Sequence, residues 1–229
     1  MSPFLTGARR EQPLAALAAR VLAVGALSAS LALGACVTLF PKSPPAQLYR
    51  FGSEARAESP PAPTTATMAP IGLRLTTGFT RAAEGDRLLT ISGDQTAYIA
   101  NSRWVEPASV LFDEAAVRAF EASNTPFRLL QRGDIGSSSL TLRLDVETFE
   151  ADYGAGWTGS PTVVVRVRAL LTGSGEKGVP IAQVFECRTP AGENRVGAIV
   201  AAYGAAANDV LGQVLGWATA QSAAISSSG

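Results

Sequence analysis

The chain of 229 residues contains no histidine, and this absence narrows its chemistry more than any other feature of its composition. Without histidine there is no Ser-His or Cys-His catalysis, no zinc site with histidine ligands, and no imidazole base near neutral pH. Lysine is scarce as well, since the one lysine beyond the proline-rich part of the chain is Lys177, in the turn-like stretch GSGEKG. We therefore expect a protein that is not an enzyme and that needs neither a cofactor nor a metal ion.

Cysteine is rare too, with Cys36 and Cys187 alone. Cys36 comes just after an uncharged apolar run, residues 21–33, which itself follows three arginines. This order of charged and apolar residues is typical of a secretory signal peptide. A membrane-spanning helix needs about twenty apolar residues, and starting it at Leu14 would place Arg20 in the bilayer at a cost of about 2.5 to 3.5 kcal/mol. Residues 1–35 are therefore predicted to be a signal peptide.

The residues before Cys36 resemble the lipobox of bacterial lipoproteins, because Leu33 is followed by two small residues and then by the cysteine. The resemblance implies that Cys36 becomes the first residue of the mature chain and carries a diacylglyceryl group and an amide-linked acyl chain. Two or more acyl chains anchor a protein stably to a membrane. Val37, in place of aspartate, resembles the Gram-negative pattern for sorting to the outer membrane. The alternative is an ordinary signal peptide, with Cys36 free or bonded to Cys187, although Cys187 is simpler to explain as a small buried thiol in a strand.

The charge of the mature chain is close to zero. Residues 1–35 hold three arginines and one glutamate, so the remainder has 16 basic and 18 acidic side chains and a net charge of about −2. Proteins that bind nucleic acid carry a basic patch or stripe. Because nothing in the sequence resembles such a patch, no nucleic-acid partner is expected.

Proline divides the chain into regions. Residues 41–70 hold seven of the fourteen prolines, so residues 36–70 are predicted to be a lipidated, extended linker that lets a folded domain stand away from the membrane. Within this linker, residues 48–51 alternate apolar and polar side chains and are predicted as a first short strand. The folded domain is expected at 71–221, and the serine-rich tail 222–229 is expected to be disordered.

The periodicity of apolar residues predicts the elements of this domain. Strands are expected at 72–77, 87–92, 95–101, 140–147, 163–171 and 181–188, with a hairpin turn at Gly93-Asp94. Helices are expected at 107–121 and 196–217. The residues that share the apolar face of the first helix are Val110, Leu111, Ala115, Val117 and Phe120. The predicted fold is α+β, a single domain with a mostly antiparallel sheet and two helices packed on it.

Two patterns suggest ligand binding but have simpler explanations. Residues 154–159 match the dinucleotide-binding pattern G-x-G-x-x-G, yet a strand follows where that motif requires a helix, so a hairpin connection is expected. The acidic series Asp145, Glu147, Glu150 and Asp152 suggests a metal site. Its first two members alternate with Leu144 and Val146, so they are expected on the solvated face of the strand instead.

Aromatic residues near this hairpin leave a question open. Phe149, Tyr153 and Trp157 either form an exposed apolar patch or are scattered single exposures, which are common on protein surfaces. The sequence does not separate these alternatives.

Residues 96–123 resemble a motif of a known protein family. A strand runs into the stretch RWVEP, residues 103–107, and then into an amphipathic helix. This order resembles the core motif of the ABC-type transport auxiliary lipoprotein family, which includes PqiC-type proteins. The lipobox, the proline-containing spacer, the aromatic residues of YRF at 49–51 and a closing helix near Trp217 follow the same layout. The insert 60–70 is longer than the family pattern, and an arginine separates the two aromatic residues of YRF.

The resemblance implies an accessory subunit of an ABC/MCE-type intermembrane lipid transport system, with an MCE-domain periplasmic protein and ABC transporter subunits as partners. The domain would be held by Cys36 on the periplasmic face of the outer membrane of a Gram-negative bacterium, where it would tether or dock the MCE assembly. The alternative is a freestanding periplasmic lipoprotein that binds an apolar ligand or assists envelope assembly. A homo-oligomer stays open in either case.

Arg103, Trp104 and Glu106 are the candidate partner contacts in this reading. The structural alternative, which we favour, is a core position for Trp104 with Arg103 and Glu106 paired beside it. An exposed apolar patch opposite the anchor would favour the tether, whereas an enclosed cavity of about 300 Å³ or more would favour the ligand binder.

Overall fold

The computed structural model describes residues 45–52, 71–123, 125–130, 138–173 and 180–227. All of them lie in one compact unit, Pro45–Gly229. The predicted signal peptide, the lipidated Cys36 and most of the predicted linker lie outside the described residues. The strand expected at 48–51 is present as β1, one residue earlier, so the folded part of the chain begins well before residue 71.

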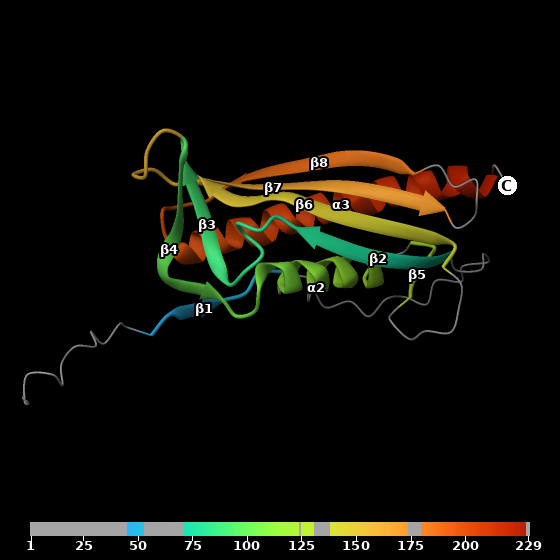
Figure 1. Ribbon diagram of the computed structural model, residues 1–229, viewed down its shortest axis with the longest axis horizontal. Coiled ribbons are helices and arrows are strands. Elements are labelled where there is room, and N and C mark those ends of the chain that lie inside the picture. The colour runs from blue at the N-terminus through green and yellow to red at the C-terminus, as the bar shows by residue number, and fades with distance from the viewer. Residues whose placement is uncertain (1–44, 53–70, 124, 131–137, 174–179, 228–229) are drawn as a thin grey trace, which may run out of the picture. The chain divides into compact units, whose positions relative to one another are not determined.

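The described residues form one eight-stranded sheet (Figure 1). Its strands are β1 (Gln47–Tyr49), β2 (Ile71–Phe79), β3 (Arg87–Ser92), β4 (Gln95–Trp104), β5 (Phe127–Leu129), β6 (Leu140–Asp152), β7 (Thr162–Gly173) and β8 (Ile181–Pro190). The long strand β6 lies at the centre, with β7 and then β8 on one side. On its other side, β6 pairs with β2 along its first half and with β3 at its last two residues.

The sheet is mixed, which corrects the prediction of a mostly antiparallel one. The predicted meander of β6, β7 and β8 is antiparallel, and so is the β3–β4 hairpin. The pairs β1–β4, β2–β5, β2–β6 and β3–β6 are parallel. Alternation of apolar residues identifies a strand but not its neighbours, and parallel neighbours need a long connection that local patterns do not reveal.

The predicted hairpin turn between β3 and β4 is confirmed. Ser92 pairs with Gln95 across a two-residue loop, and Gly93 has a positive φ of 55°. A positive φ at the first central residue is the requirement of a type II′ turn, which glycine meets without strain.

A β-bulge in β6 changes which residues of this strand face the core. The pairing with β7 shifts between Val146 and Thr148. Before the shift the buried residues are at even positions up to Val146, and after it they are Phe149 and Ala151. The sequence shows the same change of phase, because a bulge inserts one extra residue and moves the following side chains to the other face.

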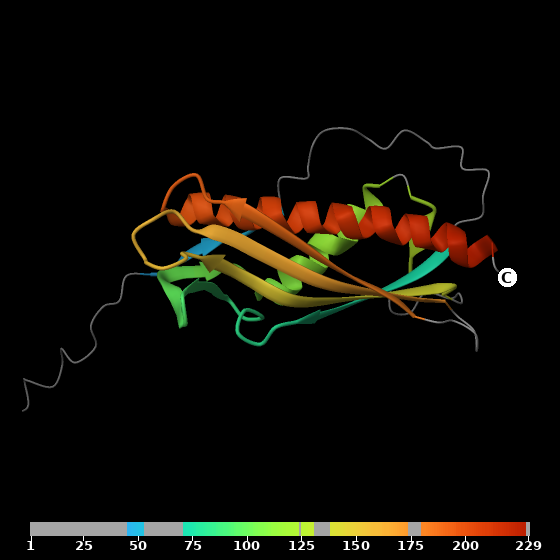
Figure 2. The same ribbon diagram turned by 90° about the horizontal axis from the view of Figure 1, so that it is seen from above.

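Two helices, α2 (Ala108–Glu121) and α3 (Val196–Ser227), lie on one face of the sheet (Figure 2). Helix α2 packs on β2, β5 and α3, and α3 packs on β7 and β8. The expected face of α2 is partly wrong, since Val110 is exposed while Phe112 and Ala116 are buried. Helix α3 also continues through Ser227, so the tail expected to be disordered is helical at 222–227.

Among the described residues, the segment Val196–Ser222 of α3 is long and apolar enough to cross a membrane by length and composition alone. Half of its most apolar stretch is buried in the domain. This pattern is the one expected of a long helix that packs on a sheet.

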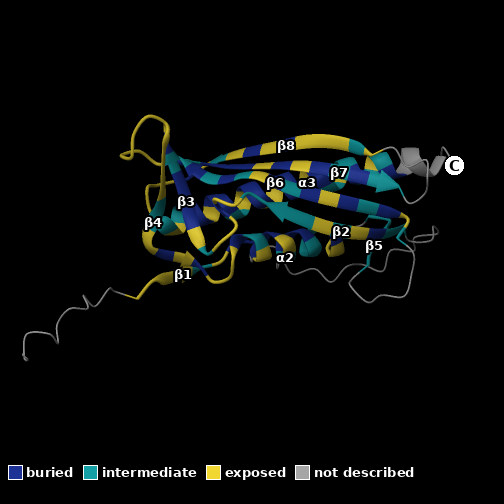
Figure 3. Cartoon of the chain, in the orientation of Figure 1, coloured by how far each residue is buried: buried dark blue, intermediate teal, exposed yellow. Residues whose placement is uncertain are grey.

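Figure 3 shows where the buried residues lie along the strands and helices. The core that these residues form is rich in aromatic rings. Phe149 of β6 lies 4.7 Å from the ring of Tyr203 of α3 and 5.2 Å from that of Phe51, which follows β1. The Tyr203 hydroxyl donates a 2.7 Å hydrogen bond to the carbonyl of Leu89, so its polar atom is satisfied in the interior. Burial raises the pKa of Tyr203 well above its ordinary value, which keeps this hydroxyl protonated as a donor.

Candidate functional site

The stretch RWVEP leads from β4 into α2 and meets β1. Strand β1 runs parallel to the end of β4, with Tyr49 opposite Trp104. The N–H of Val105 donates a 2.8 Å hydrogen bond to the carbonyl of Tyr49, and the N–H of Trp104 donates one of 2.7 Å to the carbonyl of Asp86. Pro107 then stands at the N-cap position of α2. The family motif is therefore the junction where three elements are joined.

Trp104 is a core residue, as we expected on structural grounds. Its side chain is almost fully buried, and its ring makes edge contacts with Phe51 at 5.0 Å and with Tyr203 at 5.3 Å. T-shaped aromatic pairs of this kind stabilise a core beyond their buried area. Trp104 thus holds β4, the segment after β1 and α3 together, and it does not present a surface to a partner.

The predicted pairing of Arg103 with Glu106 is wrong. One guanidinium nitrogen of Arg103 lies 3.0 and 2.8 Å from the two carboxylate oxygens of Asp86. Glu106 is exposed and forms no ion pair with any residue that the structure describes. Of the three candidate contact residues, Arg103 and Glu106 are therefore accessible to a partner and Trp104 is not.

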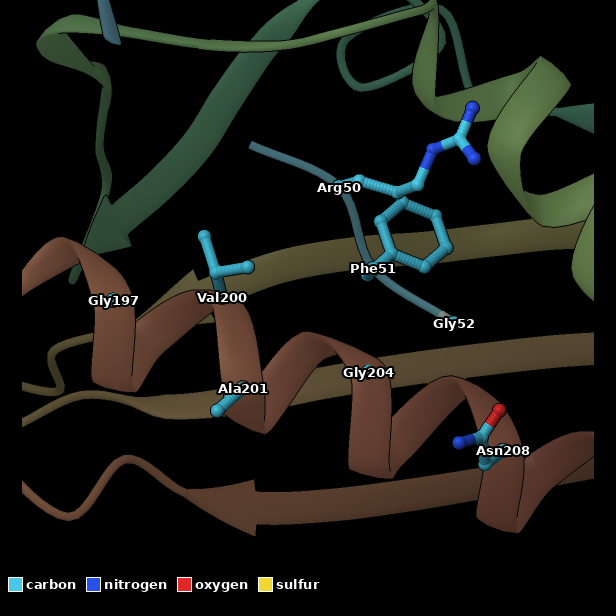
Figure 4. Close-up of a pocket in the computed structure, with 8 residues that line it drawn as sticks. All are labelled: Arg50, Phe51, Gly52, Gly197, Val200, Ala201, Gly204 and Asn208. Carbon is cyan, nitrogen blue, oxygen red and sulfur yellow. The ribbon is translucent and has the colours of Figure 1, made fainter. Parts of the chain in front are cut away.

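A shallow pocket lies between the segment after β1 and the first turns of α3 (Figure 4). Its volume is about 140 Å³. Helix α3 supplies mostly small side chains to it, and the guanidinium of Arg50 points away from α3 in Figure 4. The lining residues are Arg50, Phe51, Gly52, Gly197, Val200, Ala201, Gly204 and Asn208. The pocket is well below the volume of about 300 Å³ at which small-molecule sites begin.

Gly52 is the residue that lets this segment approach α2. Its φ is +74°, a left-handed conformation that costs other residues energy. A Cβ at Gly52 would lie 3.3 Å from the Cβ of Ala115 and 3.2 Å from the guanidinium of Arg118. That guanidinium donates a 3.3 Å hydrogen bond to the carbonyl of Gly52. Phe51 is thus held in the core by a contact that needs glycine beside it.

The face of the sheet opposite the helices carries a network of ion pairs across β6, β7 and β8. Arg166 contacts Glu147 at 3.1 Å and Glu186 at 3.2 Å, and Arg188 contacts Glu186 at 2.7 Å. The hydrogen bond from Arg188, and then that from Arg166, lowers the pKa of Glu186. Asp145 and Glu147 thus lie on the solvated face as predicted. No group of acidic or cysteine side chains among the described residues could hold a metal ion.

The aromatic residues near the β6–β7 connection fall into two environments. Phe149 is buried in the core, whereas Trp157 is 38% exposed and its ring lies 5.2 Å from that of Tyr153. The Trp157 indole donates a 3.2 Å hydrogen bond to the side chain of Gln95, and the Tyr153 hydroxyl donates one of 2.8 Å to Asn194. An exposed aromatic pair therefore joins the β6–β7 connection to β4 and to the segment before α3.

Cys187 is a buried thiol in β8, as the sequence suggested. The side-chain amide of Gln213 lies 3.1 Å from its sulfur. Burial and the nearby Asp209 carboxylate raise the pKa of Cys187. A raised pKa lowers the thiolate fraction, so this cysteine is a structural residue rather than a nucleophile.

Comparison with known proteins identifies the family of this chain. The model of the family described as ABC-type transport auxiliary lipoprotein component matches residues 57–214, which is more than half of the sequence. The chain belongs to this family. The resemblance inferred from the junction motif is thereby confirmed, and the protein is an auxiliary lipoprotein component of the ABC-transport type. The family match includes the whole span from β2 into α3.

Solved structures share the fold of this auxiliary lipoprotein. Protein XCC0632 from Xanthomonas campestris matches with a TM-score of 0.64 and 22% identity, over 80% of this chain and 99% of its own. A crystal structure of an uncharacterized protein matches with a TM-score of 0.58 and 14% identity, over 75% of this chain and 97% of its own. No curated protein sequence matches the chain. At these identities the likeness concerns the fold alone.

Proposed function

We propose that the protein is a lipoprotein anchored to the periplasmic face of the outer membrane, where it serves as an accessory subunit of an ABC/MCE-type intermembrane lipid transport system. The family match over residues 57–214 carries this proposal. It links the lipobox ending at Cys36 to a family that is defined by ABC-type transport. The anchored domain would hold the periplasmic MCE assembly at the outer membrane, so that an apolar molecule crosses the periplasm shielded from water.

The filled interior supports a docking role over a freestanding binder of apolar ligands. The rings of Phe51, Trp104 and Phe149 occupy the space between the sheet and the helices. The pocket beside Phe51 measures about 140 Å³, whereas small-molecule sites usually start near 300 Å³. The proposed docking role therefore depends on the surface of the domain and not on a cavity inside it.

Arg103 and Glu106 are proposed to contact the partner, since both are exposed beside the junction of β1, β4 and α2. Glu106→Lys tests this assignment because it reverses a charge without breaking an ion pair. We expect it to reduce recovery of the partner, since a like-charge contact across an interface costs affinity. Glu121→Lys is a matched control, because Glu121 is also exposed, forms no ion pair with any residue that the structure describes, and lies at the other end of α2. Equal recovery with both variants would remove Glu106 from the interface.

The proposal as a whole is tested by affinity capture of the tagged full-length protein from detergent-solubilised membranes. Mass spectrometry should identify an MCE-domain protein and an ABC subunit with it, together with an acylated N-terminal peptide that begins at Cys36. Cys36→Ser should shift the protein out of the membrane fraction. An acylated protein that is recovered alone would contradict the role in a transport complex.

A further inference from the structure

One end of the domain, which we name the β4 end, combines exposed apolar side chains with two stretches of chain that carry no charge. It comprises Leu48 of β1, residues 95–102 of β4, Val105, and the β6–β7 connection 153–161. Residues 95–102 and 153–161 contain no Asp, Glu, Lys or Arg. In Figure 1, β3 and β4 run across this end of the domain, with β1 at one side of it and the β6–β7 connection at the other.

Exposed large apolar side chains gather at the β4 end. Among the described residues five large hydrophobic side chains are exposed, and three of them belong to this end: Leu48 at 62%, Val105 at 42% and Trp157 at 38%. Leu48 lies opposite Arg103 in the parallel pairing of β1 with β4, so both side chains project to the same side of the strands. Trp157 is held at the far end of β4 by its hydrogen bond to Gln95.

The length of the N-terminal segment limits how far this end can lie from a membrane that holds Cys36. Gln47 is the eleventh residue after Cys36, and eleven residues span at most about 36 to 40 Å. The predicted linker of 36–70 would have allowed a much longer reach. Because the chain enters the fold at β1, residues 53–70 come after the first strand in the sequence and add nothing to the tether.

The opposite end of the domain is about one tether length away from β1. The segment Val196–Ser222 of α3 contains 27 residues, or about 40 Å at 1.5 Å per residue. The first turns of α3 lie beside Arg50 and Phe51, next to β1, because they line the same pocket. Turning the far end of α3 to the membrane would require a fully extended tether, which costs conformational entropy. A domain with its β4 end toward the membrane needs no such extension.

We propose that the β4 end rests on the phospholipid surface that holds the acyl chains of Cys36. Trp157 and Tyr153 have the amphipathic rings that collect at membrane–water interfaces, and Leu48 would insert at the other end of β4. This inference rests on the proposed lipid anchor. It agrees with the proposed docking role, since a partner bound at Arg103 and Glu106 would then be held directly at the membrane.

The backbone of β4 sets the depth of this contact. Among the described strands, β1 pairs with Ser102, Arg103 and Trp104 alone, so the outer edge of residues 95–101 has no strand beside it. Backbone N–H and C=O groups need partners, which the hydrocarbon core of a bilayer does not provide. The edge of β4 therefore lies among hydrated headgroups, and the side chains of Leu48 and Trp157 reach the upper part of the acyl chains.

The test uses full-length, acylated protein in vesicles of phosphatidylethanolamine and phosphatidylglycerol with brominated acyl chains, which quench tryptophan emission on contact. Leu48→Trp places a reporter at the β4 end. Val184→Trp is the matched control, because Val184 is 43% exposed and lies on the opposite, open face of β8. We expect the new emission of the Leu48 variant to be quenched several-fold more than that of the Val184 variant. Bromine near the headgroup end of the acyl chain should quench it more than bromine near the methyl end.

Quenching of the tryptophan emission of the native protein provides a second measurement. Trp104 is buried in the core and Trp217 is half-buried, so the quenchable part of the wild-type emission should come from Trp157 and disappear in Trp157→Phe. Equal quenching of the Leu48 and Val184 variants would overturn the inference. This is the result expected if a protein partner, and not lipid, covered the β4 end. The mass of the N-terminal peptide separates the two proposals. A vesicle-bound, acylated protein without quenching contradicts the membrane contact alone, whereas an unmodified Cys36 contradicts the anchor itself.

Discussion

The two faces of the sheet are built from the same three long strands but are stabilised by different interactions. On the face covered by α2 and α3, β6, β7 and β8 present buried apolar side chains, and the core polar atom of Tyr203 has its hydrogen bond. On the open face the same strands present alternating charges joined by Arg166 and Arg188. The covered face is stabilised by close packing, which tolerates little change. The open face is stabilised by exposed ion pairs, each worth little and replaceable.

The largest expected effect is on the covered face. Trp104→Ala removes a buried ring that contacts Phe51 and Tyr203, and we expect the free energy of unfolding to fall by about 3 to 5 kcal/mol. Trp157→Ala removes the same side chain from an exposed position and should cost about 1 kcal/mol or less. Urea denaturation of both variants measures the difference. Equal losses would show that burial does not distinguish these two tryptophans.

The second largest effect is expected from a comparison of two glycines on the covered face. Gly52→Ala puts a Cβ at a positive φ, 3.3 Å from Ala115, and should cost about 1 to 3 kcal/mol. Gly204→Ala is the matched change, because a Cβ on α3 would meet the Gly52 nitrogen at an ordinary 3.7 Å. Alanine also favours a helix over glycine by about 1 kcal/mol, so Gly204→Ala should leave stability unchanged or raise it. Thermal unfolding of both variants tests this contrast. A Gly204→Ala variant that is less stable than wild type would contradict it.

A smaller effect is expected on the open face. Arg166→Ala removes the contacts to Glu147 and Glu186, yet its side chain is 45% exposed. We expect a small loss of stability at low salt, and a smaller one at high salt because salt screens exposed charges. A loss as large as that of Trp104→Ala would show that the open face, too, depends on buried interactions.

The smallest effect is a dependence on pH. Burial, and then the charge of Asp152, raises the pKa of Glu150 from its ordinary 4.5. A raised pKa means that this group favours folding below its unfolded pKa and that the contribution is lost as the pH rises through the folded pKa. Glu150→Gln removes this loss, so the variant should gain stability relative to wild type between pH 4 and pH 7, by a few tenths of a kcal/mol.

Glu186 should behave in the opposite way. The hydrogen bond from Arg188 lowers the pKa of Glu186, so its contribution is present above the unfolded pKa and is lost as the pH falls through the folded pKa. Glu186→Gln should therefore be less stable than wild type at pH 7, and the deficit should shrink on acidification. Unfolding curves at several pH values compare the two variants, and slopes of the same sign would contradict both assignments.

Local patterns in the sequence predicted the second half of the fold better than the first. Leu140, Leu142 and Leu144 alternate with polar residues, and β6 buries these three side chains as expected. The bulge between Val146 and Thr148 was not predicted, although the change of phase is visible in the sequence. Strand β5 was missed because Phe127–Leu129 is too short to show a period, and the parallel pairing of β2 with β6 is a long-range property.

The candidate site was predicted in part. The stretch RWVEP marked the junction correctly, and the core position of Trp104 followed from its apolar size. The partner of Arg103 was not predicted, because Asp86 lies just before β3, 17 residues earlier in the chain. The role of Phe51 as a core residue was also missed, because residues 48–51 were predicted as a short strand within the proline-rich linker and not as part of the folded domain.

The way in which the chain enters the fold has a mechanical consequence. A lipid anchor at Cys36 would transmit any tension to the domain through Gln47, the first residue of β1. Along the strand axis, such a force loads the pairing of β1 with β4 in shear. Just behind it, the buried ring of Phe51 would have to be pulled out from between Trp104 and Phe149 before the chain could yield further. The aromatic core would thus resist the unfolding of the domain under any tension that reaches it through β1.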